Sequence, residues 1–382
     1  MKKALALILT LALCLGAVSF ASTAFATEAE YEYFYFGSYP QSKVEDTAIT
    51  AELDKLAPDW ENWTSYGYYS GSDSFNTMVQ GDWMRYTDVT LNGEKYRGVK
   101  FTQYRPNSTI STSGESNSRQ DDNGYFINNA YWFKFEPLKW RILDKDAGLV
   151  MSEMLIDSQP YNNLIYVTAP PNYYIDESGQ TFASNYAASS IRAWLNDDFY
   201  NTSFSEDEKT AISKKKINND GYKTLLGETG YEKFDSIETE DNIFLLSYDE
   251  IINTEYGFNA DTENKDSARQ AVLTDYAKCQ GAWTNENDTA DWILRTSSEN
   301  SVRVCCVWES GVIYKNFNDT SNVYMCVRPA MTVDLSYYDE PTEPTEPTEP
   351  ITPTEEKTLY DYIFAVIIEA IKAIVMIIRS YF

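Results

Sequence analysis

Residues 291–335 are DWILRTSSENSVRVCCVWESGVIYKNFNDTSNVYMCVRPAMTVDL, and their pattern is typical of the closing strands of an antiparallel sheet. From Val302 to Trp308 apolar residues alternate with other residues, and Glu309-Ser310-Gly311 offers a turn before a new apolar run at Val312. An alternation with a period of two on both sides of a turn predicts a β-hairpin. After a polar tip two more apolar runs follow, and Pro329 between them predicts an edge position or a bulge.

Two arginines, Arg295 and Arg328, lie inside these apolar runs. A guanidinium in such a setting is expected to be half-buried and paired with an acid, here Asp291 or Asp334, because an unpaired buried charge is costly. We therefore assign both arginines a structural role, with ligand binding as the alternative. The tryptophans that we assign to the same structural role are Trp140, Trp194 and Trp292.

Further short motifs precede these strands in the chain. They are Phe36-Gly37-Ser38-Tyr39-Pro40-Gln41, Lys139-Trp140-Arg141-Ile142-Leu143, Ser190-Ile191-Arg192-Ala193-Trp194-Leu195-Asn196, Phe244-Leu245-Leu246-Ser247 and Thr274-Asp275-Tyr276-Ala277. Together with W-x-L-R-T at 292–296 and V-R-P-A at 327–330, they resemble a secreted bacterial family of domains of unknown function. The pattern is also similar to the C-type-lectin-like fold of formylglycine-generating (sulfatase-modifying) and retroelement-diversified binding proteins. The resemblance implies an α+β fold of antiparallel hairpins with a few flanking helices over residues 34–335.

The chain begins with the features of a secretory signal peptide. A basic start at Lys2 and Lys3, an apolar core and a small-x-small site at Ala24-Phe25-Ala26 predict cleavage after residue 26 and a secreted, extracellular or cell-surface protein. Residues 27–382 then keep 29 basic and 58 acidic residues, a formal net charge of −29. A surface this acidic repels nucleic acid, so we expect no nucleic-acid partner.

Residues 27–338 are expected to form one domain, with residues 45–134 as an insertion that lacks the apolar residues for a core of its own. Asn92-Gly93 between two apolar runs predicts a two-residue hairpin inside it. Capping boxes place three helix starts, at Ser205-x-x-Glu208, Ser247-x-x-Glu250 and Ser267-x-x-Gln270. A fourth helix, near 190–200, would bury Ile191, Trp194, Leu195 and Phe199, which recur every three or four residues.

The last segments differ in composition from the domain. Residues 339–355 repeat Glu-Pro-Thr and predict an extended polyproline stalk. Residues 356–382 predict an apolar helix whose few charges, such as Glu369 and Lys372, lie along one narrow stripe. Such a helix is expected to lie in a membrane interface or to self-associate.

The chain contains no histidine, which excludes Ser-His-Asp and Cys-His nucleophiles and imidazole-bound metals. We expect no metal and no cofactor. Four cysteines follow the signal peptide: Cys279, Cys305, Cys306 and Cys326. Cys306 and Cys326 lie in neighbouring predicted strands and could form a disulfide, or all four could simply pack. The resemblance to formylglycine-generating enzymes implies an alternative, an oxidative enzyme that uses Cys305 and Cys306.

The resemblance to the diversified binding proteins places the ligand site just ahead of the V-R-P motif, at residues 308–324. The candidate ligand-binding residues are Trp308, Tyr314, Asn316, Phe317, Asn318, Asp319, Asn322 and Tyr324. Aromatic faces and short polar side chains suit a surface glycan or a protein ligand. The alternative is that Trp308 and Tyr324 fill the core and the tip is an ordinary polar turn. We therefore expect a non-catalytic binding module; a structural surface protein without a ligand is a third possibility.

Overall fold

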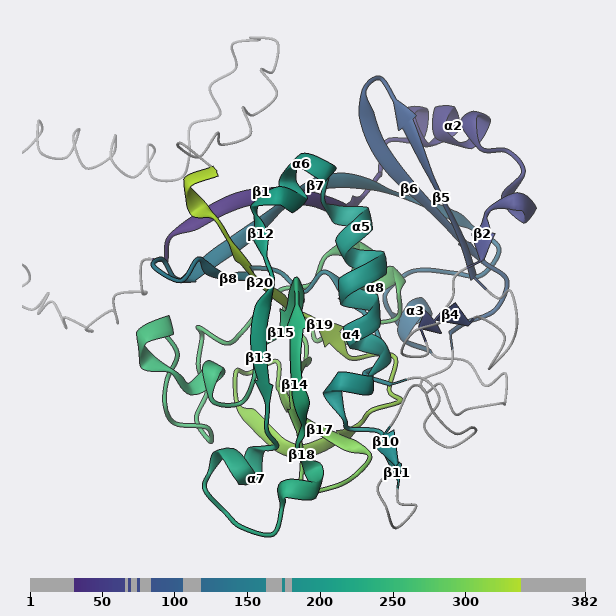
Figure 1. Cartoon of the computed structure of the whole chain (residues 1–382). Helices are drawn as coiled ribbons and strands as arrows, with labels where there is room; N and C mark the ends of the chain where they lie inside the picture. Colours follow the sequence, from purple (N-terminus) through teal and green to yellow (C-terminus); the bar gives the residue numbers. More distant parts are fainter. Residues whose placement is uncertain are drawn as a thin grey trace, which may run out of the picture. The chain divides into compact units, whose positions relative to one another are not determined.

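The computed structural model describes residues 31–65, 68–69, 74–75, 84–105, 118–162, 174–175 and 181–337. This part of the chain is a mixed α+β domain, with two larger, mostly antiparallel sheets and several short helices (Figure 1). The predicted signal peptide, stalk and C-terminal helix lie outside the described residues. Within the ranges given above, no helix is long and apolar enough to span a membrane.

The larger sheet has nine strands and is organised around β7, which runs for 15 residues. Its main path is β12-β20-β8-β7-β6-β5-β2, while β1 pairs with β7 and β15 pairs with β20. Successive side chains of β7 point to opposite faces, so Phe133 lies in the main core while Trp132 packs in a small second core. The strands are β1 (Tyr33–Lys43), β2 (Thr64–Ser65), β5 (Met84–Leu91), β6 (Glu94–Phe101), β7 (Ala130–Asp144), β8 (Leu149–Ser152), β12 (Ile212–Ser213), β15 (Ile243–Leu245) and β20 (Pro329–Val333).

The β5–β6 hairpin confirms the prediction from Asn92-Gly93. Both residues have positive φ, 53° and 88°, as a type I′ turn requires. Because β6 also pairs with β7, this part of the predicted insertion widens the larger sheet. Helix α2 (Thr47–Leu56) covers the hairpin, and the buried residues of the small second core are Leu53, Trp63, Tyr96 and Trp132 (Figure 1).

The second sheet has five strands in the order β18-β17-β16-β19-β9. Strands β17 and β18 form the predicted hairpin, and β17 also pairs with β16. Strand β19 runs parallel to β16, and β9 closes the other edge. The strands are β9 (Asp157–Ser158), β16 (Trp292–Ser297), β17 (Arg303–Val307), β18 (Ile313–Asp319) and β19 (Cys326–Val327).

Pro329 marks the point where the chain passes from one sheet to the other. Strand β19 ends at Val327 in the smaller sheet, and β20 begins at Pro329 in the larger sheet. Proline is tolerated there because it is the first residue of a strand. Arg328, between the two strands, is fully buried and donates to the carbonyl oxygens of Ser152, Arg269 and Glu153 at 2.9, 3.1 and 3.2 Å.

Both arginines lie near an acid as expected, but they are buried instead of half-buried, and the acids differ from the two expected. Arg295 pairs with Glu250 at 2.5 Å, and Arg328 lies 3.7 Å from Glu153, so neither pairs with Asp291 or Asp334. Both acids come from segments far from the arginines in sequence, and only the packing of the sheets brings them close. The three structural tryptophans, Trp140, Trp194 and Trp292, are buried as expected.

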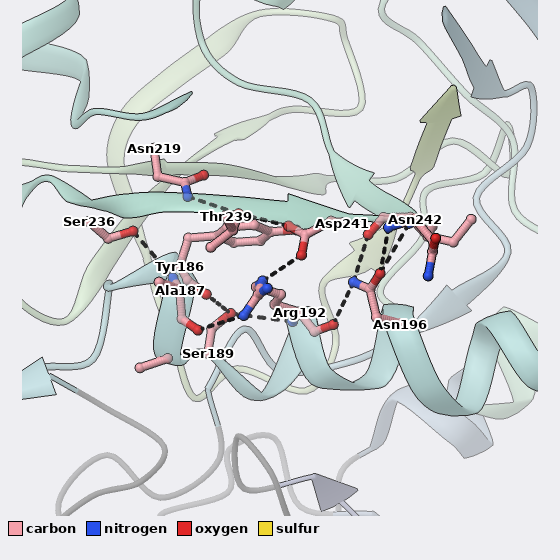
Figure 2. A network of polar contacts seen from close by, with 12 residues as sticks. Tyr186, Ala187, Ser189, Arg192, Asn196, Asn219, Ser236, Thr239, Asp241 and Asn242 are labelled. Carbon is pink, nitrogen blue, oxygen red and sulfur yellow. Dashed lines mark hydrogen bonds and ion pairs between the residues drawn. The ribbon is translucent and has the colours of Figure 1, made fainter. Parts of the chain in front are cut away.

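The predicted helix near 190–200 is confirmed and is continuous from α4 (Ser190–Trp194) through a π turn (Leu195–Phe199) into α5 (Tyr200–Ser203). Its four predicted apolar residues are all buried. Arg192 on α4 donates to Asp241 at 2.7 Å, and Thr239 donates to the other oxygen of this carboxylate at 2.8 Å. Figure 2 shows this network, which fastens the helix to strand β14.

The three capping boxes have different outcomes. Ser205 begins α6 (Glu206–Ala211) with both capping-box hydrogen bonds, as predicted. Ser247 and Glu250 form the same contacts, but only the short 3₁₀ turn η5 (Glu250–Ile252) follows. At Ser267 no helix forms: the carboxylate of Asp266 accepts from the amide of Ala268, and the chain continues as a turn.

The remaining elements are short. The helices are α3 (Ser118–Asp122), α7 (Tyr222–Leu225) and α8 (Asp275–Cys279). The 3₁₀ turns are η1 (Trp60–Asn62), η2 (Tyr186–Ala188), η4 (Glu232–Phe234), η6 (Thr254–Tyr256) and η7 (Leu335–Tyr337). Two-stranded pairs are formed by β3 (Tyr68–Tyr69) with β4 (Ser74–Phe75), β10 (Tyr174–Ile175) with β11 (Thr181–Phe182), and β13 (Lys215–Asn219) with β14 (Ser236–Asp241).

Candidate functional site

The aromatic pair Trp308–Tyr314 lies on the β17–β18 hairpin, in the lower part of Figure 1. The two rings are stacked, with centroids 4.8 Å apart and planes inclined by 16°. Trp308 packs partly against the main core, while Tyr314 remains 37% exposed. An exposed aromatic ring that is held by a stacked neighbour offers contact area to a ligand at a small entropic cost.

The turn that carries this pair is held from both sides. The amide of Trp308 donates to Val312 O and that of Gly311 to Trp308 O, each at 2.8 Å. Arg269 donates to Gly311 O at 2.8 Å from behind the turn. Gly311 has φ +81°, and a Cβ atom there would lie 2.0 Å from the carbonyl oxygen of Asp266, so only glycine fits. The aromatic pair thus stands on a preorganised turn.

The distal half of β18 is fastened by polar contacts. Ser298 Oγ lies 3.2 Å from Asn316 Oδ1, and Arg303 forms an ion pair with Asp319 at 3.3 Å. Arg303 also donates to the backbone oxygen of Asn316 at 3.2 Å. Asn316 and Asp319, two of the predicted ligand-binding residues, therefore already have partners within the hairpin. The side chains of Phe317 and Asn318 lie outside what the structure describes, although their backbone belongs to β18.

Tyr324 and Asn322 lie beside the smaller sheet. Tyr324 packs partly against the main core, and its hydroxyl accepts a hydrogen bond from Asn322 at 3.0 Å. The guanidinium of Arg119, on α3, lies 5.4 Å from the centre of the Tyr324 ring. Burial raises the pKa of the Tyr324 hydroxyl, so this group stays neutral at ordinary pH. The alternative interpretation, that Tyr324 fills the core, is therefore partly supported.

Two acids next to the aromatic pair were not among the predicted site residues. Asp291 precedes β16, and its carboxylate accepts a hydrogen bond from the amide of Glu309 at 2.9 Å. Burial and the neighbouring Glu309 carboxyl raise the pKa of Asp291 above its usual range. Because Trp292 pairs with Val307, Asp291 stands beside Trp308 at the end of the ladder. Sequence reasoning missed both acids as site residues, because their position beside Trp308 depends on the register of β16 with β17.

The predicted Cys306–Cys326 disulfide is wrong. None of the four described cysteines is in a disulfide and all four are buried, and β16 lies between β17, which carries Cys306, and β19, which carries Cys326. Strands that are second neighbours are separated by about 9.5 Å, too far for a disulfide. Cys306 packs in the main hydrophobic core. Cys326 packs in a separate hydrophobic cluster, on the other face of the smaller sheet.

The geometry of Cys305 and Cys306 does not support an oxidative site. The two residues point to opposite faces of β17, and both side chains are fully buried. Burial raises the pKa of the Cys305 thiol well above its ordinary value, which disfavours the reactive thiolate. Within the described ranges, no three side chains of His, Cys, Asp or Glu gather closely enough to hold a metal ion.

The fold and the site define an α+β domain whose exposed aromatic hairpin is held at its turn by the buried Arg269. Residues 149–335 match the family described as "Domain of unknown function (DUF6273)", so the chain carries a DUF6273 domain over these residues. The match begins at the first residue of β8, includes the whole smaller sheet and ends at Leu335. The comparisons found no match among curated proteins and none among solved structures.

Proposed function

We propose that the chain is exported and acts at the cell surface, or outside the cell, as a non-catalytic binding module for a surface glycan or a protein ligand. The observation that carries this proposal is the exposed Trp308–Tyr314 stack on a turn that Gly311 and Arg269 hold rigid. Rigid aromatic residues on a sheet edge lose little entropy when they bind, which is a common property of binding surfaces.

The location of the stack supports a binding role over a purely structural one. A tyrosine that served only the core would be buried, as Tyr276 is, whereas Tyr314 keeps more than a third of its surface exposed. Export is proposed from the N-terminal sequence. The relation to the C-type-lectin-like fold also remains a proposal, supported by the order of the sequence motifs and by the position of the candidate site ahead of the V-R-P motif.

The direct test is a binding screen with the purified chain on a glycan array and on an array of synthetic peptides. We expect a ligand whose binding is abolished by Tyr314→Ala while the melting temperature changes little. A matched control is Tyr337→Ala, because Tyr337 is 46% exposed but lies on η7, away from β18. Binding that survives Tyr314→Ala, or falls equally in both variants, would refute this placement of the site.

A further inference from the structure

We propose that the ligand of the Trp308–Tyr314 pair is a protein segment that presents a protonated amine, such as a lysine side chain, to the neighbouring carboxyl groups of Asp291 and Glu309. This inference rests on the proposed function and adds the chemical class of the ligand. An exposed aromatic stack and two neighbouring carboxyl groups lie together at one turn, and this arrangement is the basis of the inference.

Within the described part of the chain, the carboxyl groups of Asp291 and Glu309 have no cationic partner. Asp291 and Glu309 have no ion pair with a lysine or arginine among the described residues, although most of Asp291 is shielded from solvent. By contrast, two other acids of this region are paired: Asp319 with Arg303, and Glu263 with Lys315. Burial and the nearby Glu309 carboxyl disfavour the charged form of Asp291, and an ammonium group next to both carboxyl groups would favour it.

The aromatic pair supplies the second half of a site for a cation. An ammonium group is attracted to the faces of Trp and Tyr rings, and the attraction grows where carboxylates stand next to the rings. A neutral glycan would use the rings but would leave this carboxyl pair without compensation. The formal charge of −29 after the signal peptide would, in addition, attract a basic segment from a distance.

The other titratable and charged groups around Asp291 do not compete with this role. Tyr324 and Cys326 both interact electrostatically with Asp291 or lie close to it, and burial raises the pKa of both, so they stay neutral. Among the described residues, Arg119 contributes a positive charge near Tyr324, with its guanidinium 5.4 Å from the centre of the Tyr324 ring. Burial and the neighbouring Glu309 carboxyl raise the pKa of Asp291 to about 7, so loss of the Asp291 proton is the charge change expected here between about pH 5 and about pH 8.

Pentalysine and its fully acetylated form are suitable probes, because they share a length and differ in charge. We expect the full chain to bind pentalysine but not the acetylated peptide, and to bind more tightly at about pH 8 than at about pH 5. Tyr314→Ala and Glu309→Gln should each weaken binding about fivefold or more. The matched control is Glu263→Gln, which removes the same charge from the exposed pair with Lys315 and should have little effect.

The outcomes separate this inference from the proposed function. Equal losses in Glu309→Gln and Glu263→Gln would mean diffuse charge attraction and would overturn the inference. Tyr314-dependent binding to a neutral glycan, with no binding of pentalysine, would also overturn it while leaving the binding function intact. If neither kind of array nor pentalysine gives binding that depends on Tyr314, both the inference and the proposed function fail.

Discussion

Arg295 Nη1 lies 2.5 Å from Glu250 Oε2, and both side chains are largely buried between the two sheets. The same nitrogen also donates to Leu245 O at 2.7 Å, and Arg295 Nε donates to Asn218 O at 3.2 Å. One guanidinium therefore connects β16 of the smaller sheet with β15 of the larger sheet and with β13.

Replacing this guanidinium should strongly destabilise the domain. We expect Arg295→Ala to lower the free energy of unfolding by about 3 kcal/mol, because it leaves the Glu250 carboxylate buried without a partner. Urea unfolding measures the change. Lys216→Ala is the control, since its ion pair with Glu238 is exposed to solvent and should contribute little to stability. Equal melting temperatures for wild type and Arg295→Ala would contradict the structural role.

The same pair should make stability depend on pH in the acid range. Burial alone would raise the pKa of Glu250, but Arg295 and Lys215 outweigh it and lower the pKa to about 2. A carboxyl group with a lowered folded-state pKa stabilises the fold above its ordinary pKa, and this contribution is lost as the pH falls towards 2.

We therefore expect the stability difference between wild type and Glu250→Gln to be largest near neutral pH and to shrink below about pH 4. Urea unfolding of both proteins across this range measures it. Subtracting the variant removes the contribution of Asp157, whose burial raises its pKa to about 6 and acts in the opposite direction. A difference that stays constant down to pH 2 would show that the pair is not coupled to protonation in this way.

Gly311→Ala should destabilise the domain by more than the left-handed backbone conformation of this residue alone explains. Gly93 and Gly311 both have positive φ, but a Cβ atom at Gly93 would meet nothing within 4 Å, whereas at Gly311 it would lie 2.0 Å from Asp266 O. We expect Gly93→Ala to lower the free energy of unfolding by about 1 kcal/mol because of the left-handed conformation, and Gly311→Ala to lower it by clearly more. Thermal unfolding compares them, and similar losses would argue against the tight contact.

Arg328→Lys should also destabilise the domain although it keeps the charge. The guanidinium donates to three backbone carbonyl groups, and a single ammonium group cannot reproduce that geometry. We expect a loss of about 2 kcal/mol in the free energy of unfolding, measured in urea. If Arg328→Lys has the same free energy of unfolding as the wild type, the charge of Arg328 alone would account for its contribution to stability.

The C-terminal segment gives a prediction that is independent of the domain. Deleting residues 355–382 should yield a monomer that no longer sediments with lipid vesicles, because the predicted helix has a wide apolar face. Sedimentation with and without vesicles measures both properties. A full-length chain that is already monomeric and indifferent to lipid would contradict the prediction.

Local patterns predicted local structure well. The hairpins at Asn92-Gly93 and Glu309-Ser310-Gly311 and the helix that starts at Ser205 depend on residues a few positions apart, and all three are present. The Ser267 box failed although its spacing matches that of Ser205: the carboxylate of Asp266 accepts from the amide of Ala268, and the chain forms a turn there instead of a helix. A capping motif can supply hydrogen bonds to the first amides of a helix, but it does not ensure that a helix follows.

Long-range pairings could not be predicted in the same way. Glu250 is 45 residues from Arg295 in sequence, and one acid among 58 cannot be chosen without the packing of the sheets. The Cys306–Cys326 error has the same origin, because strand order is set by long-range pairing and β16 separates the two strands. At the candidate site, Trp308 and Tyr314 were proposed from the resemblance and from their residue types, whereas Asp291 and Glu309 required the register of β16 with β17.

The passage of the chain from β19 to β20 also constrains how the domain is made during synthesis. Strand β20 lies between β8 on one side and β12 and β15 on the other, so the larger sheet is incomplete until residue 333 has emerged from the ribosome. Pairings this distant in sequence form slowly and leave strand edges open meanwhile. A nascent chain stalled before Arg328 should therefore remain sensitive to protease, and protection should appear only once β20 is available.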